Sequence, residues 1–331
     1  MLEGTWKRLG LVAVLALVLV IAACGSGDDS SEEAEGNGED TEQSENGSDS
    51  EGSDSEEGSS DSEGSSDSEI THEGEIELVY VEWATEIAST NVIGKVLEDL
   101  GYDVTLTPLD NAVMWQSVAS GNADGMVAAW LPNTHGDLYE QHKDSLVDLG
   151  ANYEGAKVGA VVPQYMDVDS LENLGEYGEE LDETITGIEP GAGVVQATET
   201  AVETYEGLDG WTVQTSSSGA MATSLQEAYE NEEPIVVTGW SPHWKFAEMD
   251  LKYLEDPENV YGDAETIDTM VREGLEEDLP GAYQVLDNFQ WGEEKFNSVM
   301  AEIQAGASPE EAAANFVENN QDLVEEWTTM E

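Results

Sequence analysis

From residue 76 onward, short apolar segments alternate with longer segments whose apolar residues recur at helical spacing. This alternation is typical of βαβ units, and it predicts an α/β fold with a mainly parallel sheet. The segments expected as strands are residues 76–83, 103–109, 125–130, 157–166, 211–217 and 234–240. Ligands of open α/β sheets bind beyond the carboxyl ends of the strands, so we expect a site where these segments end.

Beyond Lys252 the pattern becomes helical. The helices expected there are residues 264–279, 281–289, 293–306 and 309–327. Two α/β runs followed by helices predict a two-lobed protein that holds its ligand in the cleft between the lobes. Residues 76–165 would form the first lobe, completed by residues 252–331, and residues 166–251 would form the second.

The amino terminus has the features of an export signal. A basic pair precedes an apolar run from Leu11 to Ala23, which is shorter than the roughly 20 residues that a spanning helix needs. Residues 21–24, Ile-Ala-Ala-Cys, resemble the lipobox of bacterial and archaeal lipoproteins, whose cysteine is lipidated. We therefore expect residues 1–23 to be a signal peptide and Cys24 to anchor the protein on the extracytoplasmic face of the cell membrane. An uncleaved signal anchor is the alternative.

Residues 24–75 consist largely of Ser, Gly, Asp and Glu. Such a segment buries too little surface to offset its ordering entropy, so we expect a disordered acidic tether. The whole chain carries 74 Asp and Glu against 9 Lys and Arg, a net charge of −65. This charge argues against nucleic acid as a partner, because phosphate binding requires clustered cations. It also indicates a salt-loving organism, in which screening limits self-repulsion.

Three tryptophans, Trp83, Trp130 and Trp240, terminate segments that are expected as strands. Indole faces attract cations, and several faces together recognise quaternary ammonium groups, which have no N–H to donate. Large aromatic residues also fill cores, so any one of the three could serve packing alone. Because closing lobes would bring all three together, we expect them to form a cage. The other tryptophans of the folded part, Trp115 and Trp244 among them, are assigned to packing.

Several longer strings carry a resemblance to a known family. The strings "WATEIASTNVIGKVLEDLGY", "AAWLPNTH", "VVPQYM", "GIEPGAG", "VVTGWSPHW" and "LKYLEDP" resemble the glycine betaine-binding proteins of osmoregulatory ABC importers. The similarity extends over nearly all of residues 76–331. It implies a two-lobed periplasmic-binding-protein-like fold of type II, with a three-tryptophan cage for the trimethylammonium head and a carboxylate site made by backbone amides and a histidine.

Carried over position by position, the resemblance places the cage on the three tryptophans named above. It places the histidine on His135 and the amides on Gly193 and Val194. The sequence itself supports the assignment of the amides. The string "GIEPGAGVV" is a Gly-containing loop that opens a helix, and free N–H groups at the start of a helix suit a carboxylate. Alone, such a loop is commonly only a turn, and a single histidine is commonly a surface or capping residue.

Catalysis is not expected. The chain has no G-x-S-x-G and no H-E-x-x-H motif, and its four histidines lack metal-ligand spacing. Cys24 is the only cysteine, so neither a disulfide nor a Cys-based zinc site can form within the chain. We therefore predict a binding protein without a cofactor or metal.

The expected function is to capture glycine betaine, or a related quaternary-ammonium solute, and deliver it to the permease and ATPase of an ABC importer. A tethered receptor that signals to a membrane partner would share the fold and the site, so it stays open as an alternative. Proline betaine, carnitine, choline and dimethylsulfoniopropionate also present a methylated onium group. A carboxylate site argues against choline.

Overall fold

The computed structural model describes residues 73–330. The expected signal peptide, Cys24 and the tether up to residue 72 lie outside the described residues. Within residues 73–330, no helix is long and apolar enough to cross a membrane.

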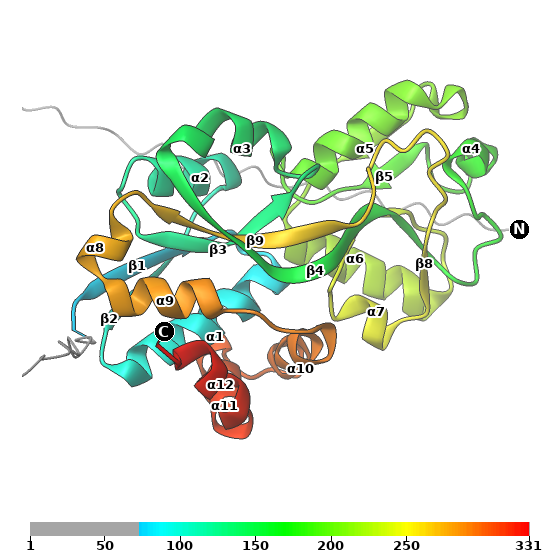
Figure 1. Cartoon of the computed structure of the whole chain (residues 1–331). Helices are drawn as coiled ribbons and strands as arrows, with labels where there is room; N and C mark the ends of the chain where they lie inside the picture. The colour runs from blue at the N-terminus through cyan, green and yellow to red at the C-terminus, as the bar shows by residue number, and fades with distance from the viewer. Residues whose placement is uncertain (1–72, 331) are drawn as a thin grey trace, which may run out of the picture. The chain divides into compact units, whose positions relative to one another are not determined.

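The described residues form a sheet of nine strands (Figure 1). The strands are β1 (Glu75–Tyr80), β2 (Asp103–Pro108), β3 (Gly125–Leu131), β4 (Leu146–Pro163), β5 (Thr184–Thr186), β6 (Thr212–Gln214), β7 (Val237–Ser241), β8 (Leu251–Tyr253) and β9 (Glu265–Arg272). Their order is β2-β1-β3-β9-β4-β7-β5-β6, and β8 pairs with β4. The expected parallel pairs occur between β1 and both β2 and β3, and between β5 and both β6 and β7. The prediction of a mainly parallel sheet was wrong, because β4 and β9 are antiparallel to their neighbours.

Helices connect these strands and extend to the carboxyl end of the described chain. They are α1 (Ala84–Leu100), α2 (Asn111–Ala119), α3 (Gly136–His142), α4 (Leu171–Leu174), α5 (Gly193–Thr204), α6 (Ser218–Asn231), α7 (Lys245–Glu248), α8 (Leu275–Asp278), α9 (Pro280–Asn288), α10 (Glu293–Gln304), α11 (Pro309–Asn319) and α12 (Gln321–Thr328). The segment 309–327, expected as helical, forms two helices that are separated at Asn320.

Strand β9 contradicts the helix that was expected over residues 264–279. Its apolar residues Ile267, Met270 and Val271 have helical spacing, which is why the pattern indicated a helix. However, β9 pairs with β3 on one side and β4 on the other, and it is buried on both faces. A strand buried on both faces need not alternate apolar and polar residues, so the pattern was ambiguous. Only the short helix α8 remains of the prediction.

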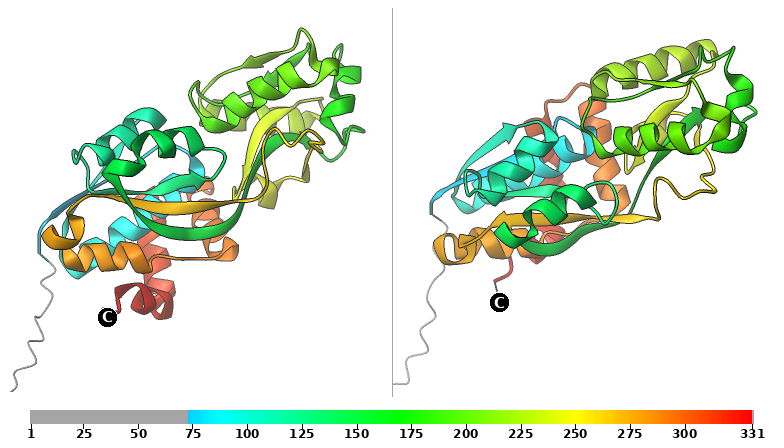
Figure 2. Two further views of the ribbon diagram at one scale, coloured as in Figure 1. Left: turned by 45° about the horizontal axis from the view of Figure 1, so that its top comes forward. Right: turned by 90° about the horizontal axis from the view of Figure 1, so that it is seen from above.

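Strand β4 connects the two parts of the sheet. Residues Leu146–Ala156 pair with β9, and residues Lys157–Pro163 pair with β7 and β8. We call β2, β1, β3, β9 and the first part of β4 the first half-sheet, and the remaining strands with the second part of β4 the second half-sheet. The strand that was expected at residues 157–166, as a crossover between the lobes, corresponds to the second part of β4, residues Lys157–Pro163. Figure 2 shows the two half-sheets joined by β4 and by the segment that precedes β9.

The helices pack on both faces of the first half-sheet, α2 and α3 on one face and α1 with α9 on the other (Figure 1). Helix α1 also packs against α10 and α11. Near these helices, Trp291 and Trp327 lie in an aromatic cluster with three phenylalanines, and Trp327 Nε1 donates to the Gln290 carbonyl at 2.9 Å. The assignment of these two tryptophans to packing is therefore confirmed.

Candidate functional site

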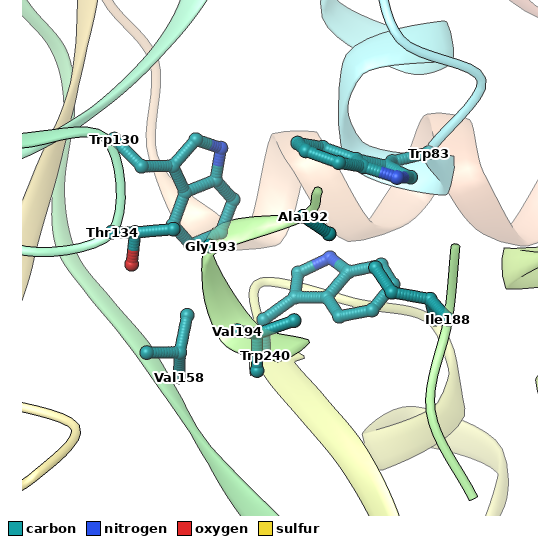
Figure 3. Close-up of a pocket in the computed structure, with 9 residues that line it drawn as sticks. All are labelled: Trp83, Trp130, Thr134, Val158, Ile188, Ala192, Gly193, Val194 and Trp240. Atoms are coloured by element: carbon teal, nitrogen blue, oxygen red, sulfur yellow. The ribbon is translucent and has the colours of Figure 1, made fainter. Parts of the chain in front are cut away.

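A pocket lies where the two half-sheets meet. Its lining is almost wholly apolar: Trp83, Trp130, Thr134, Val158, Ile188, Ala192, Gly193, Val194 and Trp240. Figure 3 shows the three indole rings around a common space, with the Gly193 segment beside them. The structure therefore brings together five of the six residues that were expected to bind ligand.

The cage tryptophans lie at strand ends. Trp130 and Trp240 are the next-to-last residues of β3 and β7, and Trp83 follows β1 and caps the amino end of α1. Trp130, Trp240 and Trp83 are 3%, 4% and 6% exposed, respectively. Each of the two strands then turns away through a cis peptide bond, before Pro132 and before Pro242.

The rings of Trp83 and Trp240 form a wedge. Their centroids are 6.5 Å apart and their planes are inclined by 53°. A cation beside the line that joins the two centroids can lie within about 6 Å of both, which is the range of cation–π attraction. With Trp130 as a third wall, the arrangement suits a compact onium group that has no N–H.

The indole N–H groups are bonded outside the pocket. Trp240 Nε1 donates to Thr85 Oγ1 at 2.8 Å, Trp130 Nε1 donates to Glu86 Oε1 at 3.2 Å, and Trp83 Nε1 donates to Glu189 Oε1. Side chains of the first turn of α1 therefore accept hydrogen bonds from two of the rings. The third ring belongs to Trp83, the residue that precedes α1. Because each N–H is occupied, the rings present only their faces to a ligand.

Glu86 is a buried carboxyl group behind the cage. Its Oε2 accepts a hydrogen bond from the Val81 amide at 3.2 Å, and its other oxygen accepts from Trp130. Burial raises the pKa of Glu86 well above its usual value, hydrogen bonds from Val81 and Trp130 oppose this, and nearby Glu189 adds to it. An onium in the cage would favour the charged form of this carboxyl group.

The amino end of α5 forms one wall of the pocket. Gly193 and Val194 are its first residues, and among the described residues no acceptor is found for their amides. The first turn of α5 contains no acidic side chain that could occupy this position. Free N–H groups at a helix amino terminus bind anions, so a ligand carboxylate fits here.

Thr134 connects the first half-sheet to this wall. Its carbonyl and side chain lie directly against Gly193. Buried Glu265 fixes the Thr134 loop, because Oε1 accepts from the amides of Asn133 and Thr134 at 2.8 and 2.6 Å, and Oε2 accepts from Thr134 Oγ1 at 2.6 Å. These three hydrogen bonds hold the Thr134 loop in its position against α5.

His135 lies behind the cage and not in the pocket lining. It is fully buried, stacked on Trp83 with centroids 5.9 Å apart and edge-on to Trp115 at 5.8 Å. Its Nδ1 accepts from the Trp130 amide at 3.0 Å, so the ring proton is on Nε2, which makes no hydrogen bond of ordinary geometry. Burial lowers the pKa of His135 to about 3, so the ring is neutral at physiological pH. Its contact with a carboxylate stays a prediction.

Sequence reasoning missed the residues that hold the cage. Thr85, Glu86 and Glu189 act through contacts across 44 to 155 positions of the chain, which no local pattern reveals. A weak signal was available, since Thr85 and Glu86 lie two and three positions after Trp83, at the start of the quoted string "WATEIASTNVIGKVLEDLGY". Trp115 and Trp244 are buried but do not line the cage pocket, in agreement with their assignment to packing. Among residues 73–330, no group of acidic, His or Cys side chains is arranged to hold a metal ion.

Comparison with known proteins identifies relatives of this architecture. Residues 74–319 match the family described as the substrate-binding domain of ABC-type glycine betaine transport systems. The glycine betaine/carnitine transport binding protein of Listeria monocytogenes is 53% identical over 154 residues, which are 46% of this chain and 51% of that protein. The match thus spans about half the length of this curated relative.

Two solved structures share the fold. Lactococcal OpuAC, in its closed conformation with glycine betaine, is 49% identical with a TM-score of 0.75, covering 77% of this chain and all of that one. The glycine/betaine/L-proline-binding protein of Borrelia burgdorferi is 36% identical with a TM-score of 0.74, covering 77% of this chain and 97% of that one. The mixed α/β fold of this chain is therefore periplasmic-binding-protein-like, as predicted.

Proposed function

Because this chain belongs to the family of substrate-binding domains of ABC-type glycine betaine transport systems, we propose that it captures glycine betaine, or a closely related betaine, for import. The observation that carries the proposal is the pocket itself, in which three indoles with occupied N–H groups face the free amino end of a helix. An onium group and a carboxylate a few bonds apart match these two walls. The chain would act by binding and release, without catalysis or a cofactor.

The binding sites for the two ends of the ligand are proposed as follows. Trp83, Trp130 and Trp240 hold the trimethylammonium group by cation–π attraction. The amides of Gly193 and Val194 hold the carboxylate, since they have no other acceptor among the described residues. His135 adds a neutral Nε2–H donor once the ligand is bound.

The partners and the location follow from the family and the amino terminus. We propose delivery to the permease and ATPase of an ABC importer, from the extracytoplasmic face of the membrane. The two lobes of the protein would be residues 76–165 with 252–331, and residues 166–251. The acidic composition supports a protein that functions in high salt. Under these conditions a desolvated aromatic cage excludes hydrated sodium ions.

The lipid anchor at Cys24 rests on the sequence alone. We expect labelling with a radioactive lipid precursor to mark the wild-type protein and to leave Cys24→Ser unmarked. One acyl chain binds membranes only marginally, so stable anchoring requires a modification with several chains. If unlabelled Cys24→Ser remained in the membrane, an uncleaved signal anchor would hold the protein instead.

A comparison of two ligands tests the carboxylate site. Choline has the onium group but no carboxylate, and hydrogen bonds to a charged group contribute about 1.5–3 kcal/mol. We therefore expect choline to bind about ten- to a hundredfold more weakly than glycine betaine. His135→Ala should shrink this gap, because it removes one donor from the carboxylate and none from the onium.

Calorimetric titration of both ligands into wild type and His135→Ala measures the gap. If His135→Ala lowered the affinity for both ligands by the same factor, the role of His135 would be limited to packing against Trp83 and Trp115. If choline bound as tightly as glycine betaine to the wild type, the carboxylate site at Gly193 and Val194 would be wrong.

A further inference from the structure

Lys245 is the only lysine or arginine of residues 73–330 whose side chain is completely buried. It is the first residue of α7, and it lies five positions after the cage residue Trp240. Its Nζ has no hydrogen-bond partner, and it forms no ion pair among the described residues. A buried ammonium without a partner is costly, so a compensating contact or a function is expected.

The contact of Lys245 is with the cage. Its Nζ lies 4.1 Å from the ring centroid of Trp240 and 5.7 Å from that of Phe246. Lys245 does not line the pocket, although Trp240 does. The ammonium therefore covers the face of the Trp240 ring that is turned away from the pocket.

We propose that Lys245 sets the affinity of the cage: its ammonium, on the far face of Trp240, weakens the attraction of that ring for an onium in the pocket. The inference rests on the proposed function. Two cations on opposite faces of one ring share the same π electrons and repel each other through a medium of intermediate dielectric. Loss of the lysine charge should therefore tighten onium binding.

The protonation of Lys245 falls in the physiological range. Burial lowers the pKa of Lys245 to about 7, and no charged neighbour contributes to the shift. An onium that disfavours the charged lysine lowers this pKa further in the complex. By linkage, affinity is constant well above pH 7, falls as the pH is lowered through 7, and levels off once the lysine of the complex is also charged.

Two titratable groups near Lys245, His243 and Tyr253, do not titrate in this window. Burial, followed by the charge of Lys245, lowers the pKa of His243 well below its usual value, so this ring is neutral. Burial raises the pKa of Tyr253, on the neighbouring strand β8, out of the window on the alkaline side. Glu248 on α7 and Asp250 beyond it are exposed and form no ion pair with Lys245.

Glu86, which accepts a hydrogen bond from the cage residue Trp130, is a competing source of pH dependence. The raised pKa of its buried carboxyl group would also make onium binding tighter as the pH rises. Glu86→Gln keeps an amide oxygen for Trp130 and removes the titration. Comparing Glu86→Gln with a variant that lacks the Lys245 charge therefore shows which of the two groups causes the pH dependence of binding.

The test is calorimetric titration of glycine betaine into the full chain between pH 5.5 and 9 at constant ionic strength, for wild type, Lys245→Met and Glu86→Gln. Methionine keeps an unbranched chain, one atom shorter than that of lysine, and carries no charge. We expect wild type to lose about tenfold in affinity, equal to about 1.4 kcal/mol, from the alkaline to the acidic plateau. Lys245→Met should bind at the alkaline affinity throughout, and Glu86→Gln should keep the pH dependence.

Two further measurements keep the inference falsifiable. Titration of the wild type at pH 7 in buffers of different ionisation enthalpy should show net proton release on binding, which needs no variant. Lys157→Met is the matched control, because Lys157 Nζ lies 4.4 Å over the ring of Tyr253, outside the cage, and its removal should change nothing. The inference is wrong if wild type shows no pH dependence and no proton release, or if Glu86→Gln and not Lys245→Met removes them. A wild type that does not bind glycine betaine at all would overturn the proposed function, and this inference with it.

Discussion

Replacing Trp130 and Trp240 together with alanine is expected to weaken glycine betaine binding by about a thousandfold. Each desolvated cation–π contact contributes about 2 kcal/mol, and each 1.4 kcal/mol corresponds to about tenfold. The two rings come from different half-sheets, so the pair removes one wall from each side of the pocket. Calorimetric titration of the double variant measures the loss.

The control for the cage is a tryptophan outside it. Trp244→Ala also removes a buried indole, but Trp244 does not line the pocket and should lower stability more than affinity. Near-wild-type affinity in the folded double variant would show that the indoles are packing residues.

Gly193→Ala is expected to weaken glycine betaine binding by roughly a hundredfold while leaving the free protein stable. A Cβ at position 193 would lie 2.2 Å from the Thr134 carbonyl oxygen and 2.6 Å from Thr134 Cγ2. Glu265 fixes the Thr134 loop, so the loop cannot yield. Inserting a methyl group into a packed site costs about 1–3 kcal/mol, which prevents α5 from approaching the first half-sheet.

The chain offers a matched control for this substitution. Gly193 has no left-handed backbone conformation, so alanine suits the start of α5 and should not impair folding. Gly219 holds the corresponding early position in α6, with nothing within 4 Å of its added Cβ. Gly219→Ala should bind like wild type, and thermal unfolding should show both variants folded. Wild-type affinity in Gly193→Ala would mean that this close approach is not needed for binding.

The cage could be predicted from sequence because its signals are local. Each of the three tryptophans ends an apolar segment, and the carboxyl ends of strands form one edge of an α/β sheet. The same logic found the helix start at Gly193, where a Gly-containing loop precedes an amphipathic segment. These features depend on neighbours a few positions away, which a single sequence shows.

The parts that could not be predicted depend on distant partners. Strand β9 looked helical because pairing with β3 and β4 on both edges, and not its own periodicity, decides its conformation. The role of Glu265 depends on Thr134, which lies 131 positions earlier, and the contact of Lys245 with the Trp240 ring depends on how the chain folds between the two residues. His135 was placed by resemblance, and the structure puts it behind the cage instead of in the pocket lining.

The proposed cage recognises the charge of a methylated ammonium group, and not merely its shape. The most direct measurement is competition calorimetry of glycine betaine against 3,3-dimethylbutanoate, which has the same shape and carboxylate but a carbon in place of the cationic nitrogen. Cation–π attraction from three rings predicts that this isostere, whose tert-butyl end is uncharged, binds at least about a hundredfold more weakly. Affinities equal within about threefold, a difference of less than 1 kcal/mol, would show that the pocket selects its ligand by apolar fit alone and not by charge.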